Sequence, residues 1–321
     1  MPKNILIVGC GAIGMWHLKG LELSNGPVRV LCVDKDPAAF GKLQNFFKKY
    51  PIEKKDFVFD FCHFSNHSKV GGRLFDLAII ATTADSRDDL LEDLVKRVQS
   101  YLWICEKPIA QSSTRSAKAV RLMSKVNCFV NHPRRLMPLY KNLKSRVVVG
   151  EPLEFSYACS NLGLACNSSH FVDLVHWLTG EMPQSVDISK LNDFWRPTKR
   201  EGFWDIDGEL KVKFSGGSKL TLTSGPSDKE RQFEVKSDDL IFCRVNESLG
   251  TISIGDDKNL DLGFLGQSEI TGKLLDDWCK FKTCGLTPLG IASDCNSVIT
   301  DGLLEHWNKI CERKDLVLPF T

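Results

Sequence analysis

The first 130 residues alternate between short apolar runs and longer amphipathic segments. Apolar runs bounded by polar residues are typical of strands buried on both faces, as in a parallel sheet. Apolar residues spaced three or four apart predict helices between them. The expected strands are 4–8, 28–33, 57–61, 75–82, 101–105 and 128–131, and the expected helices are 12–23, 86–99 and 112–125. This alternation predicts an α/β fold with a doubly wound parallel sheet and right-handed crossovers.

The pattern changes after about residue 135. Shorter strand-like stretches separated by turns, such as those at 215–218 and 225–228, are typical of an antiparallel sheet. The expected strands are 153–159, 209–214, 219–224, 232–236, 239–245 and 250–254, and the expected helices are 169–179, 269–283 and 290–309. We therefore expect two domains, residues 1–132 with the parallel sheet and residues 133–321 as an α+β domain with a mostly antiparallel sheet.

Composition narrows the class of protein. The chain has 321 residues, of which 42% are hydrophobic and 26% charged, as in ordinary globular proteins. A net charge of +2 gives no reason to expect nucleic acid or a membrane surface as a partner. The twelve cysteines lie mostly in apolar runs and form no Cys-x-x-Cys pair, so we expect reduced thiols in a cytoplasmic protein.

A glycine-rich run connects the first expected strand to the first expected helix. Gly9, Gly11 and Gly14 have Gly-x-Gly-x-x-Gly spacing. In this context the first glycine permits a tight turn, the second lets the backbone approach a pyrophosphate, and the third lets helix and strand pack closely. The backbone at Ala12 and Ile13 opens the helix and offers its amides to phosphate. The run predicts a dinucleotide site, with a glycine turn that binds nothing as the alternative.

Polar residues follow other strands at the edge where a doubly wound sheet binds ligands. Asp34 ends the second strand, twenty positions after Gly14, and is placed to accept hydrogen bonds from both adenosine ribose hydroxyls. Its charge would repel a 2′-phosphate, so NAD is expected rather than NADP, although the adjacent Lys35 has the opposite charge. Thr82 and Thr83 follow the fourth strand and are expected to contact the cofactor; the alternative for Thr82 is that it merely ends the strand.

A candidate for acid/base chemistry follows the fifth expected strand. Glu106, Lys107 and Pro108 end that strand beside the expected nicotinamide site. A partly desolvated lysine there can exchange a proton with a substrate hydroxyl or carbonyl. From position alone, a surface lysine paired with Glu106 is an equally good interpretation. We expect Glu106 and Lys107 to contact the cofactor and Lys107 to be catalytic.

Further motifs extend the pattern along the chain. They are Ala81-Thr82, Glu106-Lys107-Pro108, the segment 131–138 and the helix sequence Ser169-His170-Phe171-Val172-Asp173-Leu174. Together with the glycine run they resemble the glucose–fructose oxidoreductase / inositol dehydrogenase (Gfo/Idh/MocA) family over essentially the whole chain. The resemblance implies an N-terminal Rossmann domain, a C-terminal domain whose sheet commonly forms an oligomer interface, and therefore a homo-oligomer, either dimer or tetramer. It also implies hydride transfer between NAD(P) and a carbon of a sugar, cyclitol or nucleotide sugar.

The resemblance also implies roles for individual residues. Lys107 corresponds to the lysine beside the reacting hydroxyl, and His170 to the histidine that binds this hydroxyl or relays its proton. Pro108 is expected to follow a cis peptide bond. Asp173 either orients the imidazole of His170 or is an acid in the first turn of its helix. The expected substrate-binding residues are Lys107, Asn131, Arg135, Asn167, His170 and Asp173.

Two positions depart from the family pattern. Cys166 stands where many members have an aspartate, and a neutral thiol does not replace an anionic carboxylate; Asn167 can still hold a substrate by hydrogen bonds. Arg87 stands where a histidine is common. It either binds an anionic group of the substrate or is an exposed charge on a helix, and the second interpretation is favoured. These departures concern the proton relay and not the cofactor site.

The residues leave three functions open. The leading one is an NAD(P)-dependent dehydrogenase or reductase for a small carbohydrate-like molecule. Cys166 motivates the second, a non-catalytic dinucleotide-binding sensor or scaffold, and the third is a family member that uses bound NAD for internal redox chemistry. Cys62, His63 and His67 have metal-like spacing, but no fourth ligand accompanies them, so no metal is expected.

Overall fold

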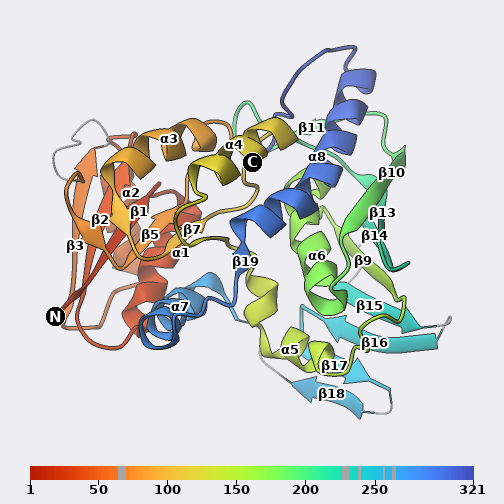
Figure 1. Cartoon of the computed structure of the whole chain (residues 1–321), viewed down its shortest axis with the longest axis horizontal. Coiled ribbons are helices and arrows are strands. Elements are labelled where there is room, and N and C mark those ends of the chain that lie inside the picture. The colour runs from red at the N-terminus through yellow and green to blue at the C-terminus, as the bar shows by residue number, and fades with distance from the viewer. Residues whose placement is uncertain (64–69, 226–230, 238–239, 256, 262–264) are drawn as a thin grey trace. The chain divides into compact units, whose positions relative to one another are not determined.

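The computed structural model of the chain describes residues 1–63, 70–225, 231–237, 240–255, 257–261 and 265–321. It divides into two compact units. The first comprises Met1–Ile109, Lys118–Pro133 and Leu265–Leu289, and the second comprises Ala110–Ala117, Arg134–Phe264 and Gly290–Thr321. Each unit is built around one large sheet (Figure 1), parallel in the first and largely antiparallel in the second, which confirms the predicted fold class.

The sheet of the first unit has the strand order β19-β8-β7-β5-β1-β2-β3. All its neighbours are parallel except β19, which runs antiparallel to β8. The side chains of the central strands β1 and β5 are almost wholly buried because helices cover both faces. The strands are β1 (Lys3–Val8), β2 (Val28–Asp34), β3 (Phe57–His63), β5 (Leu77–Ile80), β7 (Trp103–Cys105), β8 (Cys128–Val130) and β19 (Thr287–Pro288).

In this unit the first helix contacts two others. The three helices are α1 (Ala12–Gly20), which continues into the 3₁₀ helix η1 (Leu21–Leu23), α2 (Ala39–Lys49) and α7 (Gln267–Phe281). The indole of Trp16 lies 5.0 Å from the ring of Phe46 and 4.9 Å from that of Tyr50, which joins α1 to α2. In Figure 1, α7 lies beside α1. A Cβ on Gly272 would lie 2.6 Å from the carbonyl oxygen of Gly20, so only glycine permits this contact.

Helix α2 was not predicted from the sequence. Its N-cap residue is Ala38, but Asp36 and Pro37 precede it, and Asp36 Oδ1 accepts a hydrogen bond from Ala38 N at 2.9 Å, so a local signal for a helix start is present. The helices α3 (Arg87–Arg97) and α4 (Ser113–Leu122) do match expected ones. Lys118 of α4 forms an ion pair with Asp89 of α3 at 2.7 Å.

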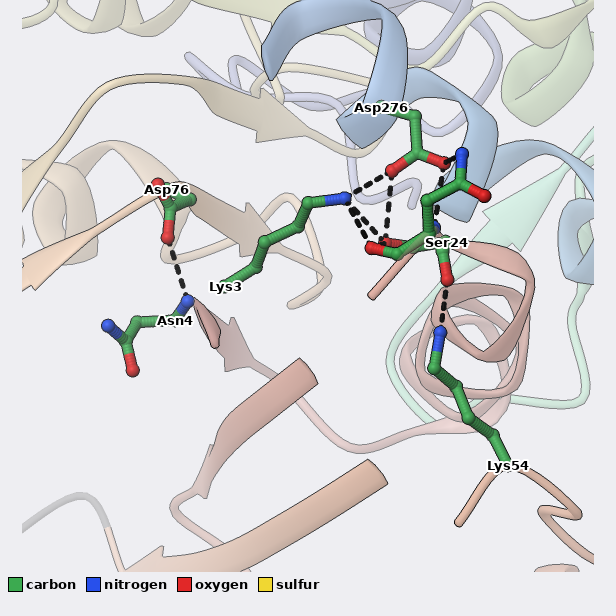
Figure 2. Close-up of polar contacts among 7 residues, drawn as sticks. Lys3, Asn4, Ser24, Lys54, Asp76 and Asp276 are labelled. Carbon is green, nitrogen blue, oxygen red and sulfur yellow. Dashed lines mark hydrogen bonds and ion pairs between the residues drawn. The ribbon is translucent and has the colours of Figure 1, made fainter. Parts of the chain in front are cut away.

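A polar cluster attaches α7 to the amino-terminal edge of the sheet (Figure 2). The carboxylate of Asp276 accepts hydrogen bonds from Lys3 Nζ, from Ser24 Oγ at 3.1 Å, and from Asn25 N and Nδ2 at 2.8 and 2.6 Å. Lys54 donates to the backbone carbonyl of Ser24. One carboxylate of α7 therefore binds the start of β1 and the end of η1, which lie some 250 positions away in sequence.

The sheet of the second unit has the order β10-β13-β14-β9-β15-β16-β17-β18, antiparallel except for the pair β9 and β14. Strand β10 was not predicted. The strands are β9 (Glu154–Ser160), β10 (Pro183–Leu191), β13 (Gly208–Phe214), β14 (Lys219–Gly225), β15 (Gln232–Ser237), β16 (Leu240–Asn246), β17 (Thr251–Ile254) and β18 (Asp257–Asp261). Short pairs add β11 (Arg196–Pro197) with β12 (Trp204–Asp205), and in the first unit β4 (Leu74–Phe75) with β6 (Gln99–Ser100).

Helices pack on the apolar face of this second sheet. They are η3 (Pro133–Leu136), α5 (Pro138–Lys144), α6 (Leu164–Thr179) and α8 (Leu289–Ile310). The ring of Phe171 in α6 lies 4.1 Å from that of Tyr157 and 6.3 Å from that of Phe233. The guanidinium of Arg134 lies 4.3 Å from the Phe171 ring centre and pairs with Glu247.

All twelve cysteines are free thiols, and most are buried as small apolar side chains. Within the described ranges, no helix combines the length and the apolar character needed to cross a bilayer.

We predict that Asp276→Ala lowers the free energy of unfolding by ~3 kcal/mol. The substitution leaves without an acceptor several donors that now share one partly buried carboxylate. Asp277→Ala, the adjacent change on the same helix, is expected to alter it by less than ~0.5 kcal/mol. Urea denaturation of both variants measures the difference. Equal losses would show that the cluster does not attach α7.

Candidate dinucleotide and catalytic site

A different structural constraint applies to each of the three glycines in the turn after β1. Gly9 has a φ of 96°, and a Cβ there would lie 2.7 Å from the carbonyl carbon of Ala81. A Cβ on Gly14 would lie 2.0 Å from the carbonyl oxygen of Gly9. The chain itself therefore requires Gly9 and Gly14. A Cβ on Gly11 would meet nothing within 4 Å, so the fold leaves open space there, as a bound pyrophosphate requires.

The start of α1 presents backbone amides beside this space. Gly11 is the N-cap residue, and no side chain caps the helix. The first intrahelical bond of the turn runs from Met15 N to the carbonyl of Gly11 at 3.0 Å. Gly11 and Ala12 are exposed and Ile13 is half-buried, so the uncapped amides face an accessible surface. Such a helix start attracts phosphate through its amides and its dipole.

Asp34 is held next to the glycine turn. Its Oδ2 accepts a hydrogen bond from Cys10 N at 2.6 Å, and its Oδ1 accepts one from Asp36 N at 2.8 Å. Each carboxylate oxygen can accept a second hydrogen bond, so both remain able to receive ribose hydroxyls. The neighbouring Lys35 is exposed, and its carbonyl accepts a hydrogen bond from His63 Nε2 at 2.9 Å.

The expected absence of a metal remains a prediction. Cys62 and His63 end β3, and His67 lies outside the described residues. Among the residues that the structure describes, no group of three potential ligands could hold an ion.

Arg87 is buried, so both interpretations of it drawn from the sequence were wrong. It is the first residue of α3 and is only 1% exposed. Its Nη1 donates to the carbonyl oxygens of Glu106, at 2.5 Å, and of Pro108, and its Nη2 donates to the carbonyl of Thr82. The guanidinium therefore binds backbone at the ends of β5 and β7 instead of being exposed to solvent or offered to a substrate.

The carboxylate of Glu106 lies inside a buried polar network. Its Oε1 accepts from His17 Nε2 at 2.9 Å and from Asn131 Nδ2 at 2.5 Å. Asn131 also donates to Gln267 Oε1 at 2.8 Å, and His17 Nδ1 lies 2.9 Å from Thr271 Oγ1. The network joins α1, the ends of β7 and β8, and α7. Sequence reasoning found Glu106 and Asn131 but missed the other three.

The network sets the charge of Glu106. Burial by itself raises the pKa of this carboxyl group, but hydrogen bonding and the charge of His17, with the hydrogen bond from Asn131, outweigh it and lower the pKa below its usual value. The residue beside Lys107 is therefore a buried carboxylate with fixed partners.

Two buried polar atoms at the carboxyl edge of the sheet have no hydrogen-bond partner among the described residues. They are Thr82 Oγ1, after β5, and Asn131 Oδ1, after β8. Buried polar atoms in native proteins are nearly always paired. Unpaired atoms at this edge fit a polar ligand group such as a carboxamide, and together with the open glycine turn they fit a dinucleotide. Thr83, the next predicted contact, is half-buried.

Lys107 follows β7 and is half-buried. The peptide bond between Lys107 and Pro108 is cis, as the sequence predicted. Because the sheet order places β8, β7, β5 and β1 side by side, the ends of these four strands, at Asn131, Lys107, Thr82 and Gly9, form one edge.

The other predicted residues lie in the second unit. Arg135 and Asp173 pair with each other: Nε–Oδ2 and Nη2–Oδ1 are both 2.7 Å, and both side chains are buried. Asn167 Nδ2 donates to the carbonyl of Leu162 at 2.6 Å. His170 is half-buried and lies one turn after Asn167 on the same face of α6.

Helix α6 begins at Leu164, five residues before the expected start. Asp173 therefore lies in the middle of the helix, and its interpretation as a first-turn acid was wrong. Cys166 instead occupies the first turn, four residues before His170 and on the same face. An acid at that position would neighbour the imidazole, so the thiol removes a charge from this face.

An acid that sequence reasoning missed lies at the start of α6. Asp205 Oδ1 accepts hydrogen bonds from Ala165 N and Ile206 N, both at 2.8 Å. A Cβ on Gly163, whose φ is 74°, would lie 2.5 Å from Asp205 Oδ2. Burial raises the pKa of the Asp205 carboxyl above its usual value, although these amides oppose the shift. No spacing rule links Asp205 to the helix that it caps.

Fold and site together define a Rossmann-type dinucleotide-binding protein. Residues 3–132 match the oxidoreductase family with an NAD-binding Rossmann fold. Over this domain the match confirms the resemblance to the Gfo/Idh/MocA family and the prediction of an NAD(P)-dependent oxidoreductase. Comparison with curated proteins gives no match.

Solved structures share the fold along nearly the whole chain. UDP-N-acetylglucosamine 3-dehydrogenase from Acidithiobacillus ferrooxidans matches with a TM-score of 0.69 at 13% identity, covering 95% of this chain and 97% of its own. A putative myo-inositol dehydrogenase from Sinorhizobium meliloti 1021 matches with a TM-score of 0.67 at 15% identity, covering 98% and 99%. An Agrobacterium radiobacter oxidoreductase in complex with NAD⁺, L-tartaric acid and magnesium matches at 0.66 and 15%, covering 96% and 97%.

The glycines offer a test that separates folding from binding. We expect Gly14→Ala to lower the free energy of unfolding by more than ~3 kcal/mol, because its methyl group would collide with buried backbone. Gly11→Ala should lower it by only ~1 kcal/mol or less, the cost of alanine at an N-cap, but weaken NADH binding at least ~10-fold, because the methyl group enters the open space. Thermal unfolding and NADH fluorescence titration measure the two effects. An unchanged affinity of Gly11→Ala for NADH would show that the pyrophosphate does not bind at this turn.

Proposed function

We propose that the protein is an NAD-dependent dehydrogenase or reductase that transfers a hydride to or from a carbon of a sugar, cyclitol or nucleotide sugar. The observation that carries the proposal is the shared edge of the first sheet. An open glycine turn with the fixed carboxylate of Asp34 lies at the end of β1, and a half-buried Lys107 follows β7 at the same edge. Doubly wound sheets bind ligands at this edge.

Lys107 is the proposed acid/base. In the oxidation direction the amine of Lys107 would accept the proton of the substrate hydroxyl, and NAD bound at the glycine turn would supply the acceptor for the hydride from the same carbon. The alcohol would become a carbonyl, with two electrons on the cofactor and the proton on the lysine. In the reverse direction the ammonium returns the proton to the new alkoxide.

His170 and Asn167 are the proposed substrate contacts on α6. Their common helical face and their partial exposure support this. Cys166 leaves that face without the usual acid, so we assign proton exchange to Lys107 and hydroxyl binding to His170. Arg135 and Asp173 were also expected to bind substrate; their mutual ion pair supports a role in fixing α6 to η3.

The substrate class follows from chemistry and from similar proteins. Hydroxyl groups suit the amide and imidazole side chains proposed as substrate contacts on α6, and two similar structures are of enzymes named for UDP-N-acetylglucosamine and myo-inositol. Cytoplasmic location and a homo-oligomeric state remain predictions.

A non-catalytic dinucleotide sensor or scaffold is the second candidate, and Cys166 is the residue that favours it. It predicts NADH binding without turnover of any sugar, and cofactor-dependent association with a partner. Internal redox chemistry, the third candidate, predicts product formation without net accumulation of NADH.

We expect Lys107→Ala to lower kcat at least ~100-fold while the dissociation constant for NADH changes less than ~3-fold, because the variant loses proton transfer and keeps the glycine turn. Lys125→Met, a change of an exposed lysine of the same unit, serves as control and should behave as the parent. NADH formation is followed by its absorbance with a panel of sugars, cyclitols and nucleotide sugars. Equal turnover by parent and Lys107→Ala would contradict the assignment.

We also expect the parent to bind NADH at least ~100-fold more tightly than NADPH, because Asp34 repels a 2′-phosphate. Asp34→Asn should reduce this preference ~10-fold or more. Asp36→Asn removes an exposed carboxylate two residues away and should leave the ratio unchanged. Fluorescence titration with both cofactors gives the ratios, and a parent without preference would refute the role of Asp34.

A further inference from the structure

We propose that Arg87 is a positioning residue for Lys107, because its buried guanidinium binds the backbone on both sides of this lysine. The inference rests on the proposed acid/base role of Lys107 and adds a residue to that site. Neither the family pattern, which commonly has histidine at this position, nor the sequence predicted such a role.

The contacts surround Lys107. The carbonyl of Glu106 belongs to the peptide group before Lys107, and it accepts from Arg87 Nη1 at 2.5 Å. The carbonyl of Pro108 belongs to the second peptide group after Lys107 and accepts a hydrogen bond from the same nitrogen. The carbonyl of Ile109 also accepts from Arg87 Nη1, at 3.4 Å.

The other arm of the guanidinium reaches the neighbouring strand. Nη2 donates to the carbonyl of Thr82, two residues beyond the end of β5. One side chain therefore connects the chain on both sides of Lys107 to the next strand end, which carries a predicted cofactor contact. A shift of either segment relative to the other would break a buried hydrogen bond.

These carbonyls need a donor because the sheet ends just before them. The last hydrogen bond that joins the two strand ends runs from Glu106 N to the carbonyl of Ile80 at 2.9 Å. Beyond it the chain has left the sheet, and Pro108 has no N–H to offer in exchange. Buried carbonyls without a donor are costly. Arg87 supplies donors at the place where the strands stop doing so.

Arginine is suited to this task and lysine is not. A guanidinium has five N–H groups in one rigid plane and can bind several converging carbonyls at fixed angles. An ammonium has three donors on a flexible stem, and a neutral imidazole has one. The arrangement therefore depends on the shape of the guanidinium and not on its charge alone.

A second, separate set of hydrogen bonds fixes the side chain of Glu106. Its carboxylate is bound by His17 and Asn131, whereas Arg87 binds its backbone carbonyl. With Glu106 held at both ends and Pro108 held at its carbonyl, the main chain of Lys107 has little freedom to move. A displacement of a reacting group by ~1 Å can lower a rate ~100-fold, so this restraint bears directly on proton transfer.

The test compares Arg87→Lys with Arg97→Lys, the same change at the exposed end of the same helix, where Arg97 pairs with Asp93 at 2.7 Å. Lys107 reactivity is measured first, because it needs no substrate. Each folded protein is reductively methylated in short pulses, and modification of Lys107 is quantified by mass spectrometry relative to Lys125. We expect the relative rate at Lys107 to change about tenfold in Arg87→Lys and to stay at the parental value in Arg97→Lys.

Rescue separates positioning from general stabilisation. Methylguanidinium added to Arg87→Ala should refill the vacated site and return the Lys107 labelling rate to that of the parent, with no such effect on Arg97→Ala. Where a substrate is turned over, Arg87→Lys should lower kcat ~100-fold and leave KM for NAD within ~3-fold.

Three outcomes would overturn the proposal. They are an unchanged Lys107 labelling rate in folded Arg87→Lys, a parallel change at Lys107 and Lys125, or Arg87→Ala that stays unfolded with and without methylguanidinium. Failure of the proposed function is seen separately. A parent that oxidises no sugar, but shows the expected change and rescue at Lys107, would refute the dehydrogenase assignment while leaving Arg87 as the residue that fixes the lysine.

Discussion

The carboxyl ends of parallel strands leave backbone groups that the sheet no longer pairs, and the first unit depends on how these are satisfied. After β1 the chain turns through glycines, and the turn is so tight that a Cβ on Gly9 would collide with the backbone of Ala81. Beyond the ends of β5 and β7 the guanidinium of Arg87 donates the hydrogen bonds that the sheet no longer supplies to the backbone carbonyls. An edge whose backbone is held in this way, with open space at Gly11 and unpaired atoms at Thr82 and Asn131, is what makes a rigid ligand site possible.

Much of the first unit could be predicted because its signals are local. Apolar runs, the glycine spacing and Asp34 each lie within a few residues of the element that they define, and the family resemblance added the cis peptide bond before Pro108. Helix α2 was missed although a local start signal, Asp36 followed by Pro37, precedes it. In the second unit, β10 was missed and α6 starts earlier than expected, since Gly163 and a distant Asp205 form its start in place of a local cap.

The errors at single residues have a common cause. Arg87 has the sequence context of a solvent-exposed helix start, with acids following it, and nothing local shows that four carbonyls converge on it. Asp173 pairs with Arg135, a residue of another element, and the spacing within α6 did not indicate this ion pair. Spacing within one element indicates which side chains share a face, but it does not indicate which residue from elsewhere meets them.

The order of the chain adds a constraint on the site itself. Gln267 and Thr271 complete the network around His17 and Glu106, but they belong to α7, which follows most of the second unit in sequence. The small residues Gly20 and Gly272 allow α7 to lie directly against α1, and Asp276 attaches it to the sheet edge. The hydrogen-bond network around the carboxylate of Glu106 is therefore complete only when α7 has packed against α1, so the cofactor unit is not defined by its N-terminal residues alone.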